Sequence, residues 1–203
     1  MMAPDPCFEY RLTQLEEIFS LSLSERERQL LWAFVQLLRH WGARINLAGP
    51  ALLADPCPHL MEGVWALRQG FISGRRIVDV GSGAGIPGIV PALCNPELQV
   101  TLIERSRKKG VFLAESIRRL GLSAALFAGG FEDFSAWGEQ QLVTLRALKP
   151  SEALLERLRR FHLPLLWFRG GREEESLGGF DVQRQLRVPG SRQRWLSLHA
   201  PNR

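Results

Sequence analysis

The clearest pattern along the chain is an alternation between short apolar runs and amphipathic segments. Apolar runs bounded by turn residues predict strands over 75–80, 98–105, 123–129, 142–148 and 163–171. Segments with apolar residues at helical spacing lie between most of them, over 89–93, 106–121 and 151–161. Strands that alternate with helices predict an α/β fold with a mostly parallel sheet and right-handed crossovers.

The two ends of the chain extend this core. Residues 22–42 predict a helix with a capping box, Ser24 and Glu27, and with Gly42 as its stop signal. Residues 45–60 predict a short irregular connection. Residues 180–200 predict two strands joined by a turn, which add an antiparallel hairpin to the sheet. We therefore expect one domain over 1–203, with a helical N-terminal extension (1–60) and an α/β core (70–203).

The predicted helix over 106–121 has an identifiable buried face. In the segment 106–121, the spacing of the apolar residues favours an inward face, and Gly121 is the expected stop. The inward candidates are Val111, Leu113, Ile117 and Leu120.

Composition narrows the class of protein. The chain has 203 residues, of which 45% are hydrophobic and 23% charged, and this is enough to bury a core. No apolar run approaches the roughly 20 residues of a membrane span, and the first residues lack a signal-peptide pattern, so we expect a cytoplasmic protein. Cys7, Cys57 and Cys94 are odd in number and lack metal-ligand spacing, so we expect structural thiols and no metal site. The net charge of +5 permits a polyanionic partner without requiring one.

The stretch "RIVDVGSGAGIPGIV", residues 76–90, predicts a ligand site. Ligands of such sheets bind beyond the carboxyl ends of the strands, where a glycine-rich loop lets them approach the backbone. Gly83, Gly85 and Gly88 fit the G-x-G-x-x-G pattern, and Glu104 follows at the next strand end, as in a dinucleotide site. The glycines alone therefore leave the cofactor open.

The acid before the loop favours S-adenosylmethionine over a dinucleotide. Asp79 would repel a pyrophosphate, whereas S-adenosylmethionine carries a sulfonium and an ammonium instead of a phosphate. Glu104 would accept hydrogen bonds from ribose hydroxyls with either cofactor. The pattern Asp79, Gly81, Gly83, Gly85 is typical of methyltransferases, although Asp79 would also fit a purely structural role as a cap of the next helix.

Seven segments resemble one family in order and spacing. They are "NLAG", "HLMEG", "IVDVGSGAGIPGI", "TLIERSRKKGVFL", "GGFEDF", "TLRAL" and "WFRGG". Together they resemble the RsmG (GidB) family, the bacterial small-subunit rRNA 7-methylguanosine methyltransferases. The resemblance implies a class I, Rossmann-like fold and methyl transfer from S-adenosylmethionine to N7 of guanine 527 in 16S rRNA. It implies a partner in 16S rRNA or the small ribosomal subunit.

Roles of single residues also follow from the resemblance. It implies that Gly81 and Ile86 line the methionine and adenosine side, and that Phe131 and Glu132 hold the adenine. Arg146 matches the arginine of the family's Ser-Arg-Ala motif. The chain departs from the family at Glu62, where an aspartate is usual, at Gly130, where an arginine is usual, and at Arg169, where a lysine is usual. These departures leave the glycine loop and its flanking acids intact.

The chemistry of the reaction sets what the site must contain. Guanine N7 has an exposed lone pair and no proton, so positioning is required and a general base is not. We expect Arg146 to bind the cofactor carboxylate, the guanine O6 or a phosphate, unless it pairs with a structural acid. Asn46 would either contact the guanine or bridge backbone groups. His59 fits a buried histidine better than a catalyst.

Basic residues form three groups, each compatible with a solvated face or with RNA phosphates. The groups are Arg105, Arg107, Lys108 and Lys109; Arg157, Arg159 and Arg160; and Arg184, Arg187, Arg192 and Arg194. Two other functions stay open, a small-molecule methyltransferase and a non-catalytic RNA-binding protein. We expect the protein to be a monomer.

Overall fold

A single seven-stranded sheet organises the protein. The computed structural model describes residues 3–171 and 177–202. The strand order is β3-β2-β1-β4-β5-β7-β6, with the first five strands parallel and the last two antiparallel. This confirms the predicted mostly parallel sheet and its antiparallel hairpin. The strands are β1 (Arg76–Val80), β2 (Gln99–Ile103), β3 (Ala124–Phe127), β4 (Leu142–Arg146), β5 (Leu165–Gly170), β6 (Phe180–Arg187) and β7 (Arg194–Pro201).

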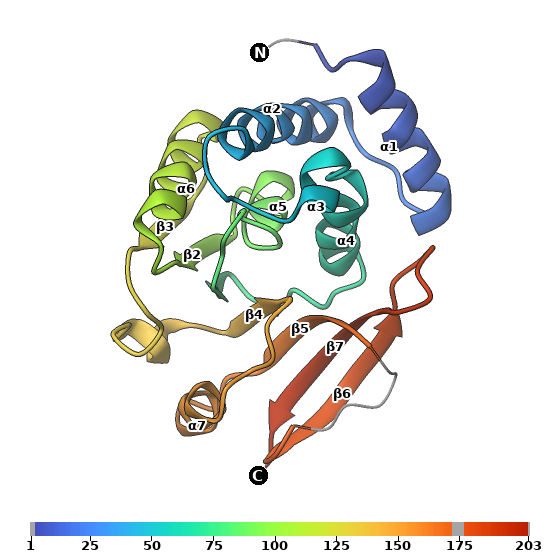
Figure 1. The fold of residues 1–203 in the computed structure, drawn as a ribbon. Coiled ribbons are helices and arrows are strands. Elements are labelled where there is room, and N and C mark those ends of the chain that lie inside the picture. The colour runs from blue at the N-terminus through green and yellow to red at the C-terminus, as the bar shows by residue number, and fades with distance from the viewer. Residues whose placement is uncertain (1–2, 172–176, 203) are drawn as a thin grey trace.

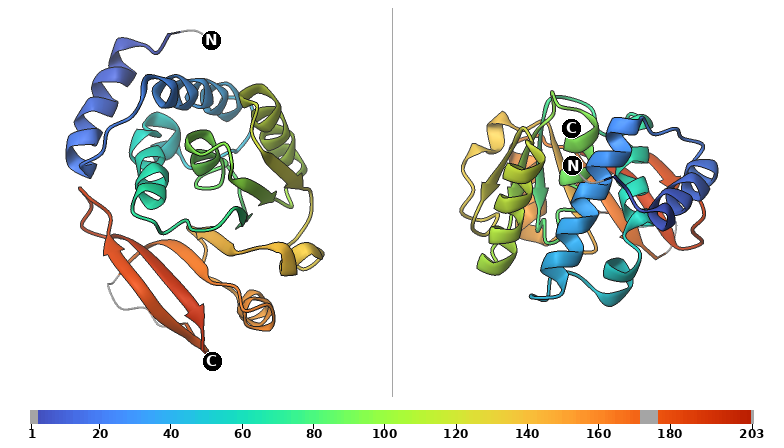
Figure 2. Two further views of the ribbon diagram at one scale, coloured as in Figure 1. Left: turned by 180° about the vertical axis from the view of Figure 1, so that it is seen from behind. Right: turned by 90° about the horizontal axis from the view of Figure 1, so that it is seen from above.

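Helices cover both faces of the sheet (Figures 1 and 2). Strand side chains alternate between the two faces, so Ile77 packs in one core and Val78 in the other. The first core is covered by α2 (Glu25–Gly42), α4 (Cys57–Arg68), α5 (Ile89–Cys94) and α6 (Arg107–Leu120), with α1 (Pro6–Phe19) packed against α4. The second core is covered by α7 (Glu152–Arg160) and by the 3-10 helix η1 (Ala136–Glu139).

Several local signals are confirmed. The capping box of α2 is present, with the Ser24 side chain accepting from the Glu27 N–H and the Glu27 carboxylate accepting from the Ser24 N–H. Helix α6 ends where expected, because Gly121 takes the left-handed conformation with φ +62°. The predicted inward face of α6 was wrong at Val111, which is 51% exposed. The buried aromatic of this helix is the neighbouring Phe112.

Residues 45–60 are more regular than the sequence predicted. They contain α3 (Pro50–Ala54) and the start of α4, and α1 was likewise not predicted. All three helices carry a proline in the first turn. Proline is tolerated there because the first N–H groups of a helix have no partner within it. In the sequence the same prolines look like breaks, which is why these helices were missed.

Other features of the described residues bear on the expected class of protein. No helix within 3–171 and 177–202 is both long and apolar enough to cross a membrane. The same residues contain no group of three or more His, Cys, Asp or Glu that could hold a metal ion. The three cysteines are free thiols, and burial raises the pKa of Cys57 and of Cys94 to about 12.

Candidate functional site

A cavity of about 490 Å³ opens at the carboxyl ends of β1, β2 and β4. In the strand order, β1 lies between β2 and β4, and this is where the sheet reverses its direction of winding. Ligands of doubly wound sheets bind at this switch point, and the volume suits a small organic molecule. A second hollow of about 380 Å³ lies near the opposite ends of β1, β2 and β3, where this rule does not place a ligand.

The glycine loop forms one wall of the cavity. It begins at Gly81, whose N–H donates to the Ile103 carbonyl at 2.9 Å and whose φ of +70° favours glycine. Gly81 and Gly83 both line the cavity. A Cβ at Gly83 would have one neighbour within 4 Å, the Gly81 carbonyl oxygen at 3.7 Å. The loop backbone is therefore open to a ligand at Gly83.

Glu104 fixes this loop from the end of β2. Its Oε2 accepts the Gly83 N–H at 2.8 Å, and its Oε1 accepts the Ser106 N–H at 2.7 Å. Glu104 as a whole is 7% exposed and lines the cavity. Each oxygen keeps a further lone pair, so Glu104 can also accept from a ligand hydroxyl.

Asp79 lies behind the loop and not among the cavity-lining residues. It is 1% exposed, and its Oδ1 accepts a hydrogen bond from the Thr144 hydroxyl at 2.6 Å. Burial raises the pKa of Asp79 to about 6, although hydrogen bonds and the charge of Arg146 oppose the shift. Gly88 packs directly on this carboxylate, because a Cβ at Gly88 would lie 2.8 Å from Oδ2.

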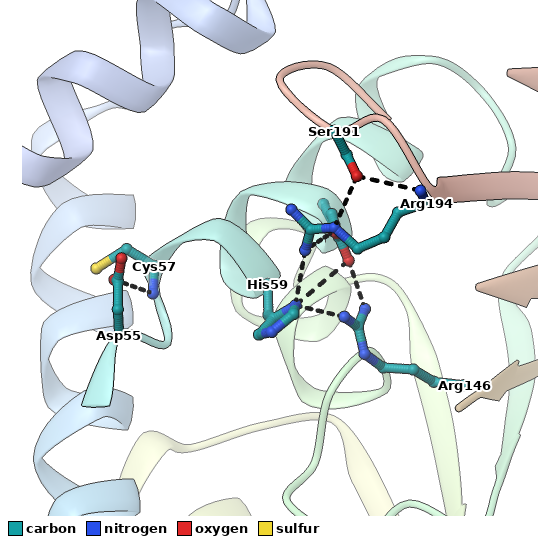
Figure 3. A network of polar contacts seen from close by, with 7 residues as sticks. Asp55, Cys57, His59, Arg146, Ser191 and Arg194 are labelled. Carbon is teal, nitrogen blue, oxygen red and sulfur yellow. Dashed lines mark hydrogen bonds and ion pairs between the residues drawn. The ribbon is translucent and has the colours of Figure 1, made fainter. Parts of the chain in front are cut away.

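Arg146, at the end of β4, lines the cavity and belongs to a partly buried charge cluster around the buried Glu62 (Figure 3). Its Nη1 donates to Glu62 Oε2 at 2.6 Å, and its Nη2 contacts His59 Nδ1. Arg194, at the start of β7, forms an ion pair with the same Glu62 and places Nη1 3.1 Å from His59 Nδ1. We call Glu62, His59, Arg146 and Arg194 the Glu62 cluster. The pairing of Arg146 with a structural acid, one of the expected alternatives, is therefore present.

Charge is the main feature of the Glu62 cluster. His59 Nδ1 lies within hydrogen-bonding distance of Arg146 and Arg194 and 3.6 Å from Glu62 Oε2. Burial alone would raise the pKa of Glu62, but the contact with His59 and the charges of Arg146 and Arg194 lower it. One carboxylate thus faces two guanidinium groups, and the cluster keeps a net positive charge beside the cavity.

The structure brings together most, though not all, of the predicted site residues. The cavity is lined by Gly81, Gly83, Glu104, Phe131, Glu132 and Arg146. Asp79, Gly85, Ile86 and Asn46 are not part of the lining. Gly85 packs on α5, since a Cβ there would meet Ile89, and Ile86 is 6% exposed in the first core. Asn46 is exposed between α2 and α3.

The sequence did not reveal one part of the wall, the segment that follows β4. Residues 147–151 line the cavity together with Leu154 of α7. The predicted end of β4 implied where this segment lies, but its residue types do not match a known ligand-binding motif. The sequence also did not reveal that Arg146 pairs with Glu62, or that Arg194 pairs with the same Glu62, because these residues lie 84 and 48 positions from Arg146 in the chain.

Comparisons with known proteins point to one family. The family model described as GidB, rRNA small subunit methyltransferase G, matches residues 27–177. A protein of Mycolicibacterium smegmatis named ribosomal RNA small subunit methyltransferase G is 38% identical over 136 residues, which cover 66% of this chain and 56% of that protein. Proteins of the same name from Gluconobacter oxydans and from Acidovorax sp. strain JS42 are 36% and 31% identical. Each match covers 66% of this chain, and 69% and 74% of those proteins respectively. The chain thus spans little more than half to about three quarters of the relatives' lengths.

Solved structures agree on the fold. A SAM dependent methyltransferase from Aquifex aeolicus has a TM-score of 0.58 at 17% identity, over 77% of this chain and 95% of that one. A mutant of MtNAS in complex with S-adenosylmethionine has a TM-score of 0.56 at 13% identity, over 98% of this chain and 80% of that one. At these identities the likeness shows a shared Rossmann-like α/β architecture.

Proposed function

This chain belongs to the rRNA small subunit methyltransferase G (GidB) family, and on that premise we propose that it transfers a methyl group from S-adenosylmethionine to N7 of a guanine in 16S rRNA. By the family resemblance the guanine is nucleotide 527. The observation that carries the proposal is the open glycine loop held by Glu104 at the switch point of the sheet. The substrate is 16S rRNA or the small ribosomal subunit, and we expect a monomer acting in the cytoplasm.

The residues of the cavity fit S-adenosylmethionine. Gly81 and Gly83 present backbone without side chains, and Glu104 supplies an acceptor at the end of β2 for the ribose hydroxyls. Phe131 and Glu132, which follow β3, supply an apolar face and an acid for the adenine. When bound, S-adenosylmethionine supplies a methyl group that is electrophilic because it is attached to a sulfonium.

Three predicted cofactor residues act indirectly in this proposal. Asp79 lies behind the loop: its main-chain carbonyl accepts the Ser82 hydroxyl of the loop at 2.9 Å, and its side chain accepts the Thr144 hydroxyl of β4. Its buried carboxylate favours a cationic ligand on the other side of the loop. Gly85 and Ile86 pack the loop on α5 and on the first core. They set the shape of the loop without lining the cavity.

In the proposed reaction the protein must also orient the guanine. N7 needs no base, so alignment of its lone pair with the methyl group supplies most of the catalysis. The Glu62 cluster holds Arg146 at the cavity edge, with a net positive charge that suits the guanine O6 or a nearby phosphate. Asn46 does not line the cavity, so the proposal assigns orientation of the base to Arg146.

Labelled methyl transfer tests the proposal. The protein is incubated with labelled S-adenosylmethionine and either free 16S rRNA or small subunits, and the product is mapped by cleavage specific for N7-methylguanine. We expect one labelled guanine. Label at another atom or only on small molecules, or calorimetric binding of NADH in place of S-adenosylmethionine, would contradict the proposal.

A further inference from the structure

The chain makes an unusual turn at the edge of the cavity. Ala147, directly after Arg146, has φ +56°, in the left-handed region that residues with a Cβ rarely adopt. Two hydrogen bonds tie the turn to β5. The Ala147 N–H donates to the Phe168 carbonyl at 3.3 Å, and the indole N–H of the buried Trp167 donates to the Leu148 carbonyl at 2.9 Å. A disfavoured backbone conformation that its surroundings enforce points to a functional constraint.

This turn places the Leu148 side chain over the glycine loop. A Cβ at Gly81 would lie 3.0 Å from Leu148 Cδ1, so the leucine reaches across from the end of β4 to the end of β1. Leu148 lines the cavity and is nevertheless 52% exposed. Four other large hydrophobic side chains of the described residues are similarly exposed, and none of them lines the cavity: Tyr10, Ile18, Val111 and Val182.

The order of the strands assigns the two ends of the cavity to different ligands. Glu104 and Phe131 follow β2 and β3, on one side of β1, and these residues hold the adenosine in the proposed function. Leu148 follows β4, on the other side of β1. The reacting methyl and the base that receives it therefore meet at the β4 end, beside Arg146.

We propose that Leu148 is the apolar surface against which the target base lies during methyl transfer. The proposal rests on the proposed function and names a substrate-positioning residue for it. Because N7 lies in the plane of the ring, its edge must stay free to meet the methyl group, and the base must be held by its faces. Enzymes that act on a base hold it by stacking against aromatic or apolar side chains. Arg146 supplies the polar contact in the ring plane, and Leu148 supplies the face.

Leu148→Ala in the full chain tests this, with Val111→Ala as the matched control. Val111 is 51% exposed and lies on α6 outside the cavity lining. We expect Leu148→Ala to bind S-adenosylhomocysteine within about twofold of wild type in calorimetry. Its kcat/KM on 16S rRNA should fall about tenfold, while Val111→Ala matches wild type. Leu148→Met, which keeps an apolar face, should recover most of the loss.

Each alternative result has its own meaning. An equal loss in S-adenosylhomocysteine affinity and in kcat/KM would place Leu148 against the cofactor and overturn the proposal. Wild-type kcat/KM in Leu148→Ala would also overturn it. Failure of the proposed function shows differently, as absence of methyl transfer to rRNA by the wild-type protein, and the role of Leu148 would fall with it.

Discussion

Arg146 connects the cavity to the interior of the protein. Both of its terminal nitrogens are engaged by the Glu62 cluster, and its guanidinium carbon lies 5.8 Å from the centre of the Phe168 ring. These contacts restrict its rotamers, so the side chain is ordered before any ligand binds. Preorganised donors of this kind act on a transition state without a cost of reorganisation.

Arg146→Ala therefore separates binding of the base from binding of the cofactor. We expect the methylation rate to fall about ten- to a hundredfold, equivalent to roughly 1.4 to 2.7 kcal/mol of transition-state stabilisation. S-adenosylhomocysteine affinity, measured by calorimetry, should change little. Arg160→Ala, at an exposed arginine of α7, is the control. An equal loss of cofactor affinity would assign Arg146 to the methionine carboxylate, and wild-type values in both assays would remove it from the site.

A second prediction at the residue scale concerns Asp79 and the pH dependence of the free energy of unfolding. Its pKa is about 6 in the folded protein because the carboxylate is buried, and about 3.9 in an unfolded chain. Between these values the folded state binds more protons, so this group's contribution to the free energy of unfolding falls as pH rises from about 4 to 6. Asp79→Asn removes the titration. When the pH is lowered from 7 to 4, the free energy of unfolding of wild type should rise by about 2 to 3 kcal/mol relative to that of Asp79→Asn.

Urea unfolding of both proteins at several pH values measures this difference. Groups that titrate alike in the two proteins cancel in the comparison, which isolates Asp79. A constant difference between wild type and Asp79→Asn over this range would mean that the carboxylate stays ionised in the folded state.

At the scale of elements, Glu62 joins three parts of the fold. It lies on α4 and pairs with Arg146 at the end of β4 and with Arg194 at the start of β7. The helices of the first face, the parallel sheet and the C-terminal hairpin thus meet at one carboxylate that is 2% exposed. Loss of its charge would leave two guanidinium groups facing each other.

Glu62→Gln should therefore destabilise the protein strongly. We expect the free energy of unfolding to fall by about 3 kcal/mol, the low end for breaking a buried ion pair, because Arg146 and Arg194 keep some contact with water. Glu152→Gln, which breaks the exposed pair with Arg159, is the control and should cost less than about 1 kcal/mol. Urea unfolding measures both. Equal effects of the two substitutions would mean that the cluster contributes nothing beyond a surface pair.

The sequence predicted elements whose signals are local. The strands, α2 with its capping box and α6 with its terminal Gly121 depend on neighbouring residues, and they were found. The segment that contains α3 and α4 was misjudged because its prolines carry the same local pattern at a helix start and in a loop.

In the candidate site, too, the sequence predicted the features that depend on neighbouring residues and not those that depend on distant ones. The glycine loop and Glu104 follow from strand ends, which a pattern reveals. The burial of Asp79 and the pairing of Arg146 with Glu62 follow from packing between distant segments. No local pattern contains that information. A single domain over 1–203, the monomeric state and the location in the cytoplasm stay predictions.

At the scale of the whole molecule, the excess of positive charge is unevenly compensated. Many arginines are paired with acids, as in Arg28 with Glu16 and Arg76 with Glu139. Among the described residues, the run Arg105, Arg107, Lys108 and Lys109 forms no ion pair, and the first turn of α6 contains no acid. Cations at a helix N-terminus are disfavoured by the helix dipole. Arg105 and Lys109 line the β2 side of the cavity, so an RNA phosphate bound at this rim would offset the repulsion.

Arg107→Ala with Lys108→Ala therefore tests which basic group binds RNA. Both side chains are exposed and neither lines the cavity. We expect weaker binding of 16S rRNA and a slope of log K against log salt that is smaller by roughly 1.4 to 1.8, because two phosphate contacts are lost. S-adenosylhomocysteine affinity should be unchanged. The control is Arg187→Ala with Arg192→Ala on the hairpin, which removes the same charge. A larger loss of RNA affinity and of salt slope in the hairpin variant would move the RNA-binding surface from α6 to β6 and β7.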